Sequence, residues 1–348
     1  MKVIFKIIIY TIVIVIASDL VMAKLFLPPD VNFREPSEYY HHGLRPNSVS
    51  YGIWGNSTYV IYTNSLGLRD KNNREVNMNS STYRIMFIGD SFTESVGYPY
   101  NMTFVGIIDD KYSDEEVEIL NAGVLSYSPK LYYLKTKYLI ERGLKFDELI
   151  VMVDISDVQD EIVYRYFEPN MNSSYSYLFA AKTFLYQNSL IFRGFYSTFR
   201  DPIKGSVGNT SAYWRDDQYN AVRGTWTVDK QELEKWGNAG LAFAEENMEK
   251  LYRICAGNKI KMTVVVYPWP TQIQENDSDS IQVSFWRNFS EERNITFINL
   301  FPYFFNPRLT TNQTIERYFI KGDVHWNEEG HAYVAELLEE DYFDKKFK

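Results

Sequence analysis

Short, β-branched, apolar segments alternate with helical segments from residue 83 onward, and this alternation restricts the fold more than any other feature of the chain. The apolar segments span residues 84–89, 117–123, 148–154, 261–267 and 295–300. Polar and apolar residues scarcely alternate within them, as expected for strands covered on both faces. Segments of helical character separate or follow them, at residues 104–112, 128–143, 228–257 and 327–341. Elements in this order predict an α/β fold with a parallel, doubly wound sheet.

The first apolar segment runs directly into Gly89, Asp90 and Ser91. In a doubly wound sheet, ligand sites form at the carboxyl ends of the strands, which is where Ser91 is expected. A Gly-Asp-Ser tripeptide alone is also compatible with an ordinary turn. A serine hydroxyl is a poor nucleophile unless a base removes its proton and an acid orients that base. A nucleophilic Ser91 therefore requires a histidine and an acid elsewhere in the chain.

Asp323 and His325 offer this pair just before the last helical segment, where Asn327 is in position to cap the helix. The other histidines are His41, His42 and His331. We expect His331, inside the helical segment, to be a packing or surface residue. His41 and His42 have no cysteine or carboxylate at ligand spacing, so no metal site is expected there.

Three blocks of sequence resemble the SGNH (GDSL-type) hydrolase family. They are Gly-Asp-Ser at 89–91, Asn-Ala-Gly at 121–123 and Asp-x-His-x-Asn at 323–327, in the family's order and each expected at the end of a strand. The resemblance covers about residues 83–342, and NSLGLRD at 64–70 resembles the exported, glycan-associated branch of that superfamily. It implies a flavodoxin-like sheet, ester hydrolysis without a cofactor or metal, Ser91 as nucleophile, His325 as base and Asp323 as the acid that orients it.

The resemblance also implies an oxyanion hole made by the backbone N–H groups of Ser91 and Gly123 and by a side chain after the third strand. The family usually has Asn-Asp at that third place, whereas this chain has Ser156 and Asp157. A hydroxyl donates one hydrogen bond less rigidly than an amide, and loss of one such donor lowers rates by about 10²–10³. The spacing of Asp323 and His325 is one residue shorter than the family's commonest form.

Acidic residues follow the third predicted strand at Asp154, Asp157, Asp160 and Glu161. Carboxylates are the ligands that Ca²⁺ and Mg²⁺ prefer, so a cation cluster is one interpretation of this stretch. Acidic residues at the exit of a strand are more often solvated, and the prediction is no metal and no cofactor.

The N-terminus has Lys2 and Lys6 followed by an uninterrupted apolar run from Ile7 to Ala17. This run has the length of the apolar part of a signal peptide, with Val21 and Ala23 at a cleavage site. Alternatively, the apolar stretch up to residue 27 is an uncleaved membrane anchor. Under both interpretations the lysines favour an N-terminus inside and an exported remainder.

Composition agrees with export. Asn-x-Ser/Thr sequons begin at Asn56, Asn79, Asn101, Asn172, Asn209, Asn276, Asn288, Asn294 and Asn312, where chance placement gives about three. A net charge of −9 argues against nucleic-acid binding, which usually requires a basic face. The single cysteine, Cys255, excludes an internal disulfide and is expected to be a small buried residue.

The expected organisation has three parts, the last of which contains an insertion. Residues 1–27 form the signal peptide or anchor, residues 28–82 an irregular lead-in with a hairpin, and residues 83–348 the catalytic domain. Between 160 and 228 the alternation of strands and helices stops, and this aromatic, helical insertion is too long for a passive connection. It is either a cap over the strand ends or a helical decoration away from them.

The expected function is that of a serine esterase that removes short acyl groups from an O-acylated glycan outside the cytoplasm, or from another small ester. Three alternatives remain open. A glycan hydroxyl in place of water would make the protein an O-acyltransferase, fed by an acyl-donor partner in the membrane. Ser156 in the place of Asn favours a catalytically weak glycan-binding protein, and the aromatic segment at 177–200 is also compatible with a lipid ester.

Overall fold

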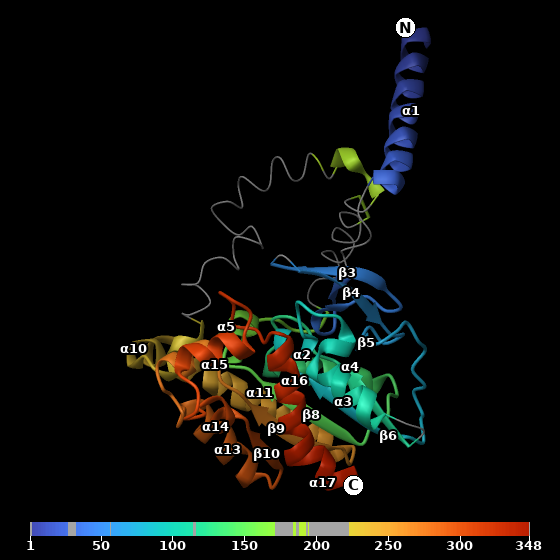
Figure 1. Cartoon of the computed structure of the whole chain (residues 1–348). Helices are drawn as coiled ribbons and strands as arrows, with labels where there is room; N and C mark the ends of the chain where they lie inside the picture. The colour runs from blue at the N-terminus through green and yellow to red at the C-terminus, as the bar shows by residue number, and fades with distance from the viewer. Residues whose placement is uncertain are drawn as a thin grey trace.

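The structure, a computed structural model, describes residues 2–26, 33–55, 57–113, 116–170, 184–185, 188–192, 194 and 223–347. Within these ranges, a central sheet has the strand order β10-β9-β8-β6-β7-β5-β4-β3 (Figure 1). Its strands are β3 (Val49–Trp54), β4 (Ser57–Thr63), β5 (Arg69–Asp70), β6 (Tyr83–Ile88), β7 (Val117–Asn121), β8 (Glu148–Val153), β9 (Lys261–Val266) and β10 (Thr296–Asn299). The five strands expected from the sequence are all present, within two residues of the predicted bounds.

The five strands from β6 to β10 pair only in parallel with one another. Numbered in chain order, they lie in the order 2-1-3-4-5, which is the flavodoxin-like arrangement. The predicted fold class is therefore confirmed. In this arrangement the chain reverses its direction across the sheet between β6 and β8, and the crevice at their carboxyl ends is the usual place for a site.

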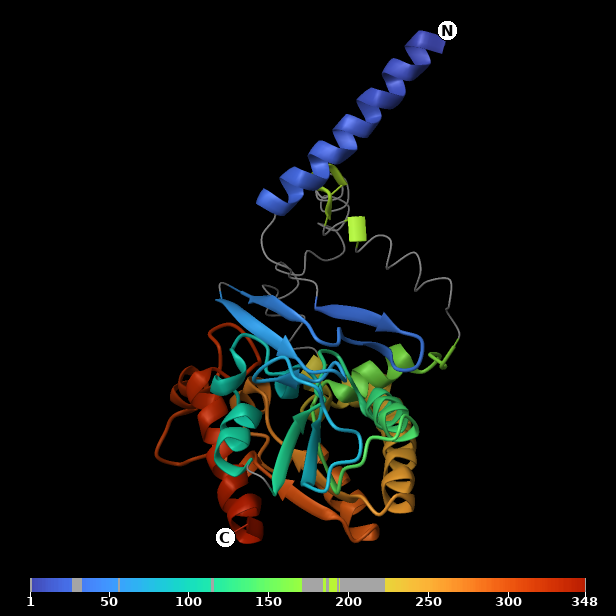
Figure 2. The ribbon, with the colours of Figure 1, turned by 90° about the vertical axis from the view of Figure 1, so that its right-hand side faces the viewer.

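Helices cover both faces of the sheet (Figure 2). One group contains α3 and α16, which contact each other, and the other contains α4, α5 and α11. The helices are α1 (Lys2–Phe26), α2 (Ser91–Glu94), α3 (Phe104–Tyr112), α4 (Pro129–Glu141), α5 (Asp157–Tyr164), α10 (Lys230–Glu232), α11 (Asn238–Gly257), α12 (Pro270–Gln274), α13 (Ile281–Glu292), α14 (Phe301–Phe304), α15 (Thr311–Tyr318), α16 (Glu328–Leu338) and α17 (Asp344–Phe347). Shorter 3-10 or π turns are η1 (Tyr100–Met102), η2 (Thr225–Thr227), η3 (Leu233–Gly237) and η4 (Glu339–Phe343).

The core lies between these helices and the parallel strands. All six residues of β8 are buried, as are five of the six in β6, which explains their continuous apolar sequence. Cys255 is fully buried in α11, as predicted. His331 is also buried, in α16, and its ring stacks on Phe104 at 6.2 Å, so it is a packing residue.

The lead-in is part of the sheet. Strands β3 and β4 form an antiparallel hairpin, and β5 joins β4 to the edge of β7 through the pair Arg69–Asn121. A separate antiparallel pair consists of β1 (Arg34–Ser37) and β2 (His41–Leu44). The region expected to be irregular therefore extends the parallel sheet by an antiparallel edge.

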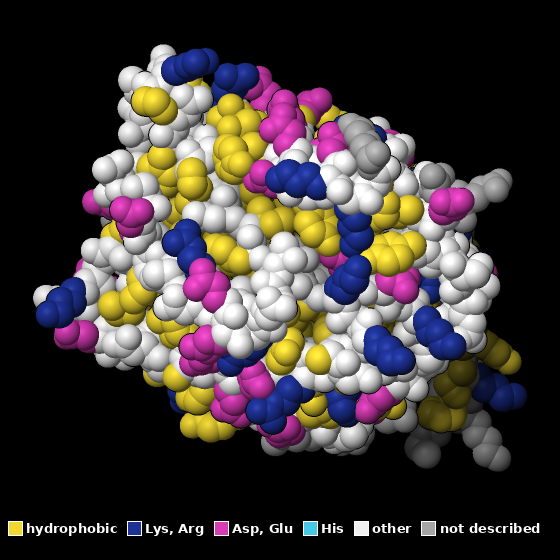
Figure 3. All heavy atoms as spheres, turned by 90° about the horizontal axis from the view of Figure 1, so that it is seen from below, with side chains coloured by type: hydrophobic (Ala, Val, Ile, Leu, Met, Phe, Trp, Pro, Cys, Tyr) yellow, Lys and Arg dark blue, Asp and Glu magenta, His cyan; other side chains and the backbone are white. Residues whose placement is uncertain are grey.

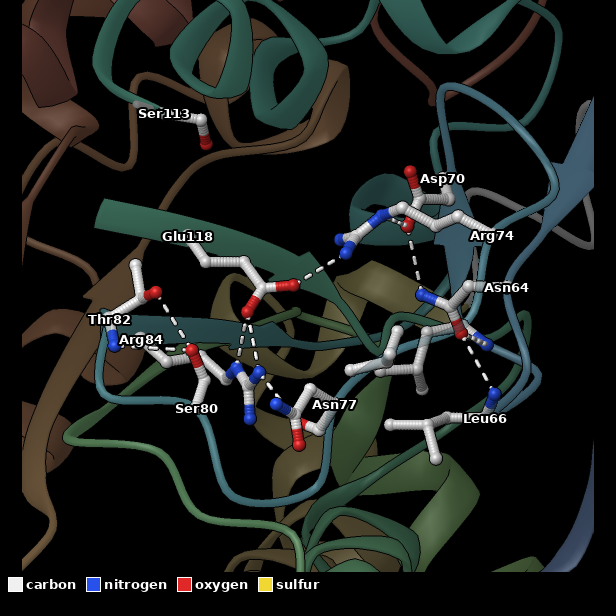
Figure 4. A network of polar contacts seen from close by, with 12 residues as sticks. Asn64, Leu66, Asp70, Arg74, Asn77, Ser80, Thr82, Arg84, Ser113 and Glu118 are labelled. Carbon is white, nitrogen blue, oxygen red and sulfur yellow. Dashed lines mark hydrogen bonds and ion pairs between the residues drawn. The ribbon is translucent and has the colours of Figure 1, made fainter. Parts of the chain in front are cut away.

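Charged side chains tie this lead-in to the parallel strands (Figure 4). Asn64 donates to Asp70 at 2.9 Å, and Arg74 bridges Asp70, at 2.9 Å, and Glu118, at 2.6 Å. Glu118, on β7, also pairs with the buried Arg84 of β6 at 2.6 Å. A network with several partners resists disruption better than an isolated surface pair, so it holds β5 in register with β7.

The N-terminal helix α1 extends away from the sheet (Figures 1 and 2). Its segment Val3–Leu25 has 23 residues and a mean hydropathy of 2.3, long and apolar enough to cross a membrane. On the face of the molecule farthest from α1, Lys and Arg are interspersed with Asp and Glu (Figure 3). Most of the insertion expected at 160–228 lies outside the described residues.

Candidate active site

Ser91 is the first residue of α2, immediately after the turn that follows β6. Asp90 begins the helix because its Oδ1 accepts the backbone N–H of Phe92 at 2.9 Å, an N-cap interaction. A Cβ atom at Gly89 would lie 2.1 Å from the Thr93 hydroxyl, so only glycine permits this tight turn. The Gly-Asp-Ser sequence thus places the Ser91 hydroxyl at the carboxyl end of β6.

The three residues expected from the sequence to form a nucleophilic group lie in contact. His325 Nε2 is 2.7 Å from Ser91 Oγ, and His325 Nδ1 is 2.6 Å from Asp323 Oδ1. A carboxylate accepts only, so Nδ1 carries the proton and Nε2 presents a lone pair to the Ser91 hydroxyl, which also lies 3.1 Å from Asp90 Oδ2. Asn327 caps α16 by accepting the Gly330 N–H at 2.9 Å, as predicted. The cap fixes the start of α16, and the loop just before it carries His325 to the carboxyl end of β6.

Trp54, from the lead-in strand β3, completes the surroundings of Asp323. Its indole N–H donates to Asp323 Oδ2 at 2.8 Å, and its ring meets the His325 ring edge-on at 4.9 Å. Burial alone would raise the pKa of Asp323, but His325 and the hydrogen bonds from His325 and Trp54 hold this pKa below its ordinary value. The sequence shows no sign of this role for Trp54, because the contact spans 269 positions.

Gly123 does not occupy the place expected for an oxyanion donor. Its N–H donates to Asn121 Oδ1 at 2.9 Å, and a Cβ atom there would lie 2.5 Å from the Glu94 backbone nitrogen. Glycine is required at 123 because the loop after β7 packs directly on α2. The expectation of an oxyanion donor at Gly123 is therefore replaced by a packing role.

Ser126, three residues later, lies in a turn beside the cavity. It occupies the third position of a turn closed by the Tyr127 N–H and the Val124 carbonyl at 3.1 Å, and its φ is +60°. It lines a small cavity together with Ser91. In the described part of the chain, the backbone N–H groups of Ser91 and Ser126 donate to no acceptor. No sequence signal points to Ser126, because positive φ is usually the property of glycine.

Ser156 lines the same cavity, but its donors are directed elsewhere. Both its N–H and its hydroxyl donate to Asp154 Oδ1, at 2.8 and 2.6 Å. A serine hydroxyl has a single proton, so the side chain presents lone pairs to the cavity. This geometry does not support the oxyanion role that the resemblance implies for Ser156. Trp269 donates to the other oxygen of Asp154 at 2.7 Å and fixes the carboxylate.

Carboxylate oxygens of Asp90, Asp154 and Asp157 lie within 4.8 Å of one another, all buried beneath Ser91. Burial, followed by the charge of Asp154, raises the pKa of Asp90 and of Asp157 well above its ordinary value. Asp157 accepts from the Tyr132 hydroxyl at 2.8 Å and from the Asp154 N–H at 3.1 Å. The cluster is thus satisfied by protein hydrogen bonds.

The other two acids of the alternative cation cluster face away from this group. Asp160 pairs with Arg223 at 2.5 Å, and Glu161 accepts from Ser128 at 2.8 Å and from Asn247 at 2.7 Å. Asp154 and Asp157 thus lie together with Asp90, whereas Asp160 and Glu161 have partners elsewhere. The geometry does not support a cation site made by these four.

The cavity beside Ser91 is small and partly apolar. It is lined by Asp90, Ser91, Leu125, Ser126, Ser156, Arg223, Trp269, Val324 and His325. Most of these residues come from the segments directly after β6, β7, β8 and β9 and from the loop before α16, whereas Arg223 lies just before η2. The cavity thus lies at the switch point of the sheet, where a flavodoxin-like fold usually has its site.

Comparisons with known proteins are consistent with this arrangement without deciding it. No protein-family model and no curated protein matches the sequence. Solved structures similar to this chain include a lipolytic G-D-S-L family protein from Veillonella parvula, with 14% identity over 75% of this chain and 99% of that one and a TM-score of 0.39. Esterase EstA from Pseudoalteromonas sp. has 12% identity over 75% and 97%, with a TM-score of 0.40.

A mutant of Axe2, an acetylxylan esterase from Geobacillus stearothermophilus, has 11% identity over 76% of this chain and 95% of that one, with a TM-score of 0.40. With identities of 11–14% and TM-scores below 0.5, these likenesses assign neither a family nor a substrate to this chain. The chemistry of the site therefore follows from its own geometry, which is a chain of hydrogen bonds from Asp323 through His325 to Ser91 at the switch point of a flavodoxin-like sheet.

Proposed function

We propose that this protein is a serine esterase of the SGNH type that removes short acyl groups from an O-acylated glycan outside the cytoplasm. The observation that carries this proposal is the pair of short contacts from His325, 2.7 Å to Ser91 Oγ and 2.6 Å to Asp323 Oδ1. Both lie within the reach required for proton transfer. A packed histidine without a catalytic role does not need a hydroxyl on one nitrogen and a carboxylate on the other.

In the proposed reaction, Ser91 Oγ attacks the ester carbonyl carbon while its proton passes to His325 Nε2. Asp323 stays ionised and stabilises the imidazolium that forms. The tetrahedral intermediate carries its negative oxygen toward the N–H groups of Ser91 and Ser126. Its collapse breaks the ester C–O bond, and the departing glycan oxygen takes the proton from His325. A water molecule, deprotonated by His325, then attacks the acyl carbon. Collapse of this second intermediate breaks the bond from the acyl carbon to Ser91 Oγ, and His325 returns its proton to Oγ as the acid leaves.

The lining of the cavity supports the proposed short acyl group. Leu125, Val324 and Trp269 close its apolar side next to Ser91, which supports a short acyl group over a long chain. The glycan part of the proposal is supported by the resemblance at residues 64–70 and by the apolar helix α1, which favours export. An esterase anchored by α1 would act on a substrate near the membrane.

Transfer to a sugar hydroxyl instead of water uses the same residues. The helix α1 favours this transferase function because a membrane anchor would hold the site beside an acyl-donor partner in the membrane. The two candidates differ only in the acceptor that attacks the acyl-enzyme, so one assay separates them.

The test uses the full chain in detergent with a fluorophosphonate probe and with p-nitrophenyl acetate. We expect labelling at Ser91, hydrolysis of the ester, and loss of both in Ser91→Ala. The matched control is Ser284→Ala, whose hydroxyl lies on the exposed side of α13 and should not affect either readout. Faster release of nitrophenol with an oligosaccharide acceptor, together with an acetylated sugar, would identify a transferase. A folded wild-type protein that neither reacts with the probe nor cleaves the ester contradicts the proposed function.

A further inference from the structure

Outside the group of Ser91, His325 and Asp323, a second histidine contacts the loop that borders the cavity. His42 lies on β2, and its Nε2 atom is 2.8 Å from the backbone oxygen of Leu125. We infer that His42 is a positioning residue that holds the peptide between Leu125 and Ser126 with its N–H directed at the cavity beside Ser91. This inference rests on the proposed function and adds to it a residue that acts through the oxyanion hole.

Hydrogen-bond chemistry assigns the proton positions on both neighbouring histidines. A carbonyl oxygen only accepts, so His42 Nε2 carries the proton that Leu125 receives. His42 Nδ1 is then a lone pair, and it lies 2.8 Å from His41 Nδ1. His41 must therefore donate from Nδ1. The chain of hydrogen bonds runs from His41 through His42 to the Leu125 carbonyl in one direction only.

The same peptide plane carries the Leu125 carbonyl and the Ser126 N–H. Among the described residues no peptide bond is cis, and in a trans peptide the C=O and N–H groups point in opposite directions. Because the carbonyl is directed to His42, the N–H is directed to the opposite side, where Ser126 lines the cavity with Ser91. The contact with His42 thus determines the direction of a donor that His42 does not touch.

This peptide needs such support because the turn conflicts with its sequence. Leu125 and Ser126 are the two central residues of the turn from Val124 to Tyr127. A turn with positive φ at its third residue usually has glycine there, whereas this chain has serine with φ of +60°. A flip of the central peptide would give Ser126 the negative φ that it prefers. The flip would also direct the Leu125 carbonyl, instead of an N–H, at the developing oxyanion.

The other contacts of the turn do not hold the peptide between Leu125 and Ser126, which His42 contacts. The Leu125 N–H donates to Glu94 Oε2 at 2.7 Å, and Glu94 pairs with Arg34. These contacts hold the peptide before Leu125 and not the one after it. The Tyr127 hydroxyl donates to the His42 carbonyl, which anchors β2 on the same loop. Burial lowers the pKa of His42 to about 3, so the imidazole stays neutral and keeps its tautomer near neutral pH.

The first test does not depend on activity. The chain has only four histidines, so the full chain labelled with ¹⁵N-histidine and held in detergent gives a simple long-range ¹H–¹⁵N spectrum. We expect His42 to be neutral with its proton on Nε2, and the signals to be assigned by His41→Asn, His42→Gln and His331→Gln. A proton on Nδ1 of His42, or a charged ring at pH 7, would overturn the inference whether or not the protein is an esterase.

The second test compares two amides at position 42. The Nε2 of glutamine reaches the place of the histidine Nε2, whereas the shorter asparagine cannot reach the Leu125 carbonyl. In hydrolysis of p-nitrophenyl acetate, we expect His42→Asn to lower kcat by about tenfold with KM within about twofold, because a misdirected oxyanion donor affects only the transition state. His42→Gln should stay within about threefold of the wild type, and His41→Asn, which leaves the Leu125 contact in place, within about twofold.

A third test measures the effect of His42→Asn in a protein that also carries Ser126→Gly. Glycine accepts positive φ without support, so the loss caused by His42→Asn should shrink to about threefold or less when residue 126 is glycine. Equal kcat for His42→Gln and His42→Asn, a loss that appears in KM, or an undiminished loss in the Ser126→Gly background would each contradict the inference. An inactive wild type counts against the proposed function, and the tautomer measurement then decides the role of His42 by itself.

Discussion

The indole nitrogen of Trp54 lies 2.8 Å from Oδ2 of Asp323, although the two residues are 269 positions apart. Trp54 is the last residue of β3, in the hairpin that precedes the parallel sheet, and Asp323 lies in the loop before α16. The lead-in therefore contributes to the site twice, through Trp54 at Asp323 and through His42 at the loop after β7. The lead-in and the parallel sheet therefore both contribute residues to the surroundings of the candidate site.

Trp54→Phe keeps an aromatic ring on His325 and removes the hydrogen bond to Asp323. We expect kcat to fall about fivefold to tenfold, because Asp323 is then held less firmly against His325. The pKa of Asp323 should rise, since one of the interactions that lowers it is lost. The control is Trp236→Phe on η3, whose indole donates to Glu232 of α10, and an unchanged kcat in Trp54→Phe would contradict the role of Trp54.

Substitutions at Ser126 should separate backbone geometry from side-chain chemistry. Ser126→Gly retains the N–H and suits the φ of +60°, so we expect wild-type kcat and a free energy of unfolding higher by about 0.5–1 kcal/mol. Ser126→Val is strained at positive φ and should lower kcat by about tenfold or more as the turn changes. Steady-state kinetics and urea titrations measure both effects. If valine leaves kcat intact, the Ser126 N–H is not an oxyanion donor.

Ser156→Ala should leave kcat and KM within about twofold of the wild type, because the hydroxyl proton is already donated to Asp154 at 2.6 Å. The expected contrast is with Ser91→Ala, which abolishes formation of the acyl-enzyme. A selective fall in kcat of tenfold or more in Ser156→Ala would show that the hydroxyl rotates toward the oxyanion during the reaction. That outcome would restore the role implied by the family resemblance.

Asp157→Asn tests the buried carboxyl cluster through the pH dependence of stability. Folding raises the pKa of Asp157 well above its ordinary value, so the folded state holds a proton that the unfolded state releases above about pH 4. The free energy of unfolding should therefore fall as the pH rises from about 4 toward the raised pKa. Asparagine removes this contribution while its amide still matches Tyr132 and the Asp154 N–H.

The measurement is the thermal midpoint at pH 5 and at pH 8. We expect the difference between the two midpoints to be smaller in Asp157→Asn than in the wild type, with the gain in stability at pH 8. Asp110→Asn, at an exposed position of α3, should behave as the wild type does. A larger difference in Asp157→Asn would mean that Asp157 is ionised in the folded protein.

Export predicts the side of the membrane on which the site lies. Protease added to intact cells or spheroplasts should digest the chain beyond residue 30, and a variant that lacks residues 2–26 should remain inside and be protected. This follows from the apolar helix Val3–Leu25 and from the lysines at its start. Complete protection of the full chain by an undamaged cytoplasmic membrane would overturn the assignment.

Local sequence patterns were sufficient to predict the parallel sheet and the approximate position of the candidate site. Continuous apolar runs such as 148–153 are possible as strands only when both faces are covered, and that condition requires helices on both sides. The turn at Gly89 was recognisable because Gly-Asp-Ser directly follows an apolar run, and the structure adds that a side chain at 89 would collide with Thr93. The pair Asp323 and His325 was recognisable because both residues lie in one short loop, before a helix with its own cap.

The antiparallel edge of the sheet and the proposed oxyanion donors could not be predicted from local sequence, because they depend on contacts between residues from different segments. Gly123 and Ser126 are three residues apart in one loop, yet the N–H of Gly123 is used by Asn121 and that of Ser126 is not used by any described residue. The sequence suggested Ser156 as an oxyanion donor, whereas in the structure its hydroxyl donates to Asp154. Sequence determines which groups a residue carries, whereas the direction of each hydrogen bond is determined by the partner that the fold brings within about 3 Å. For Asp323 and the Ser126 peptide, these partners are Trp54 and His42, which only the tertiary structure places beside them.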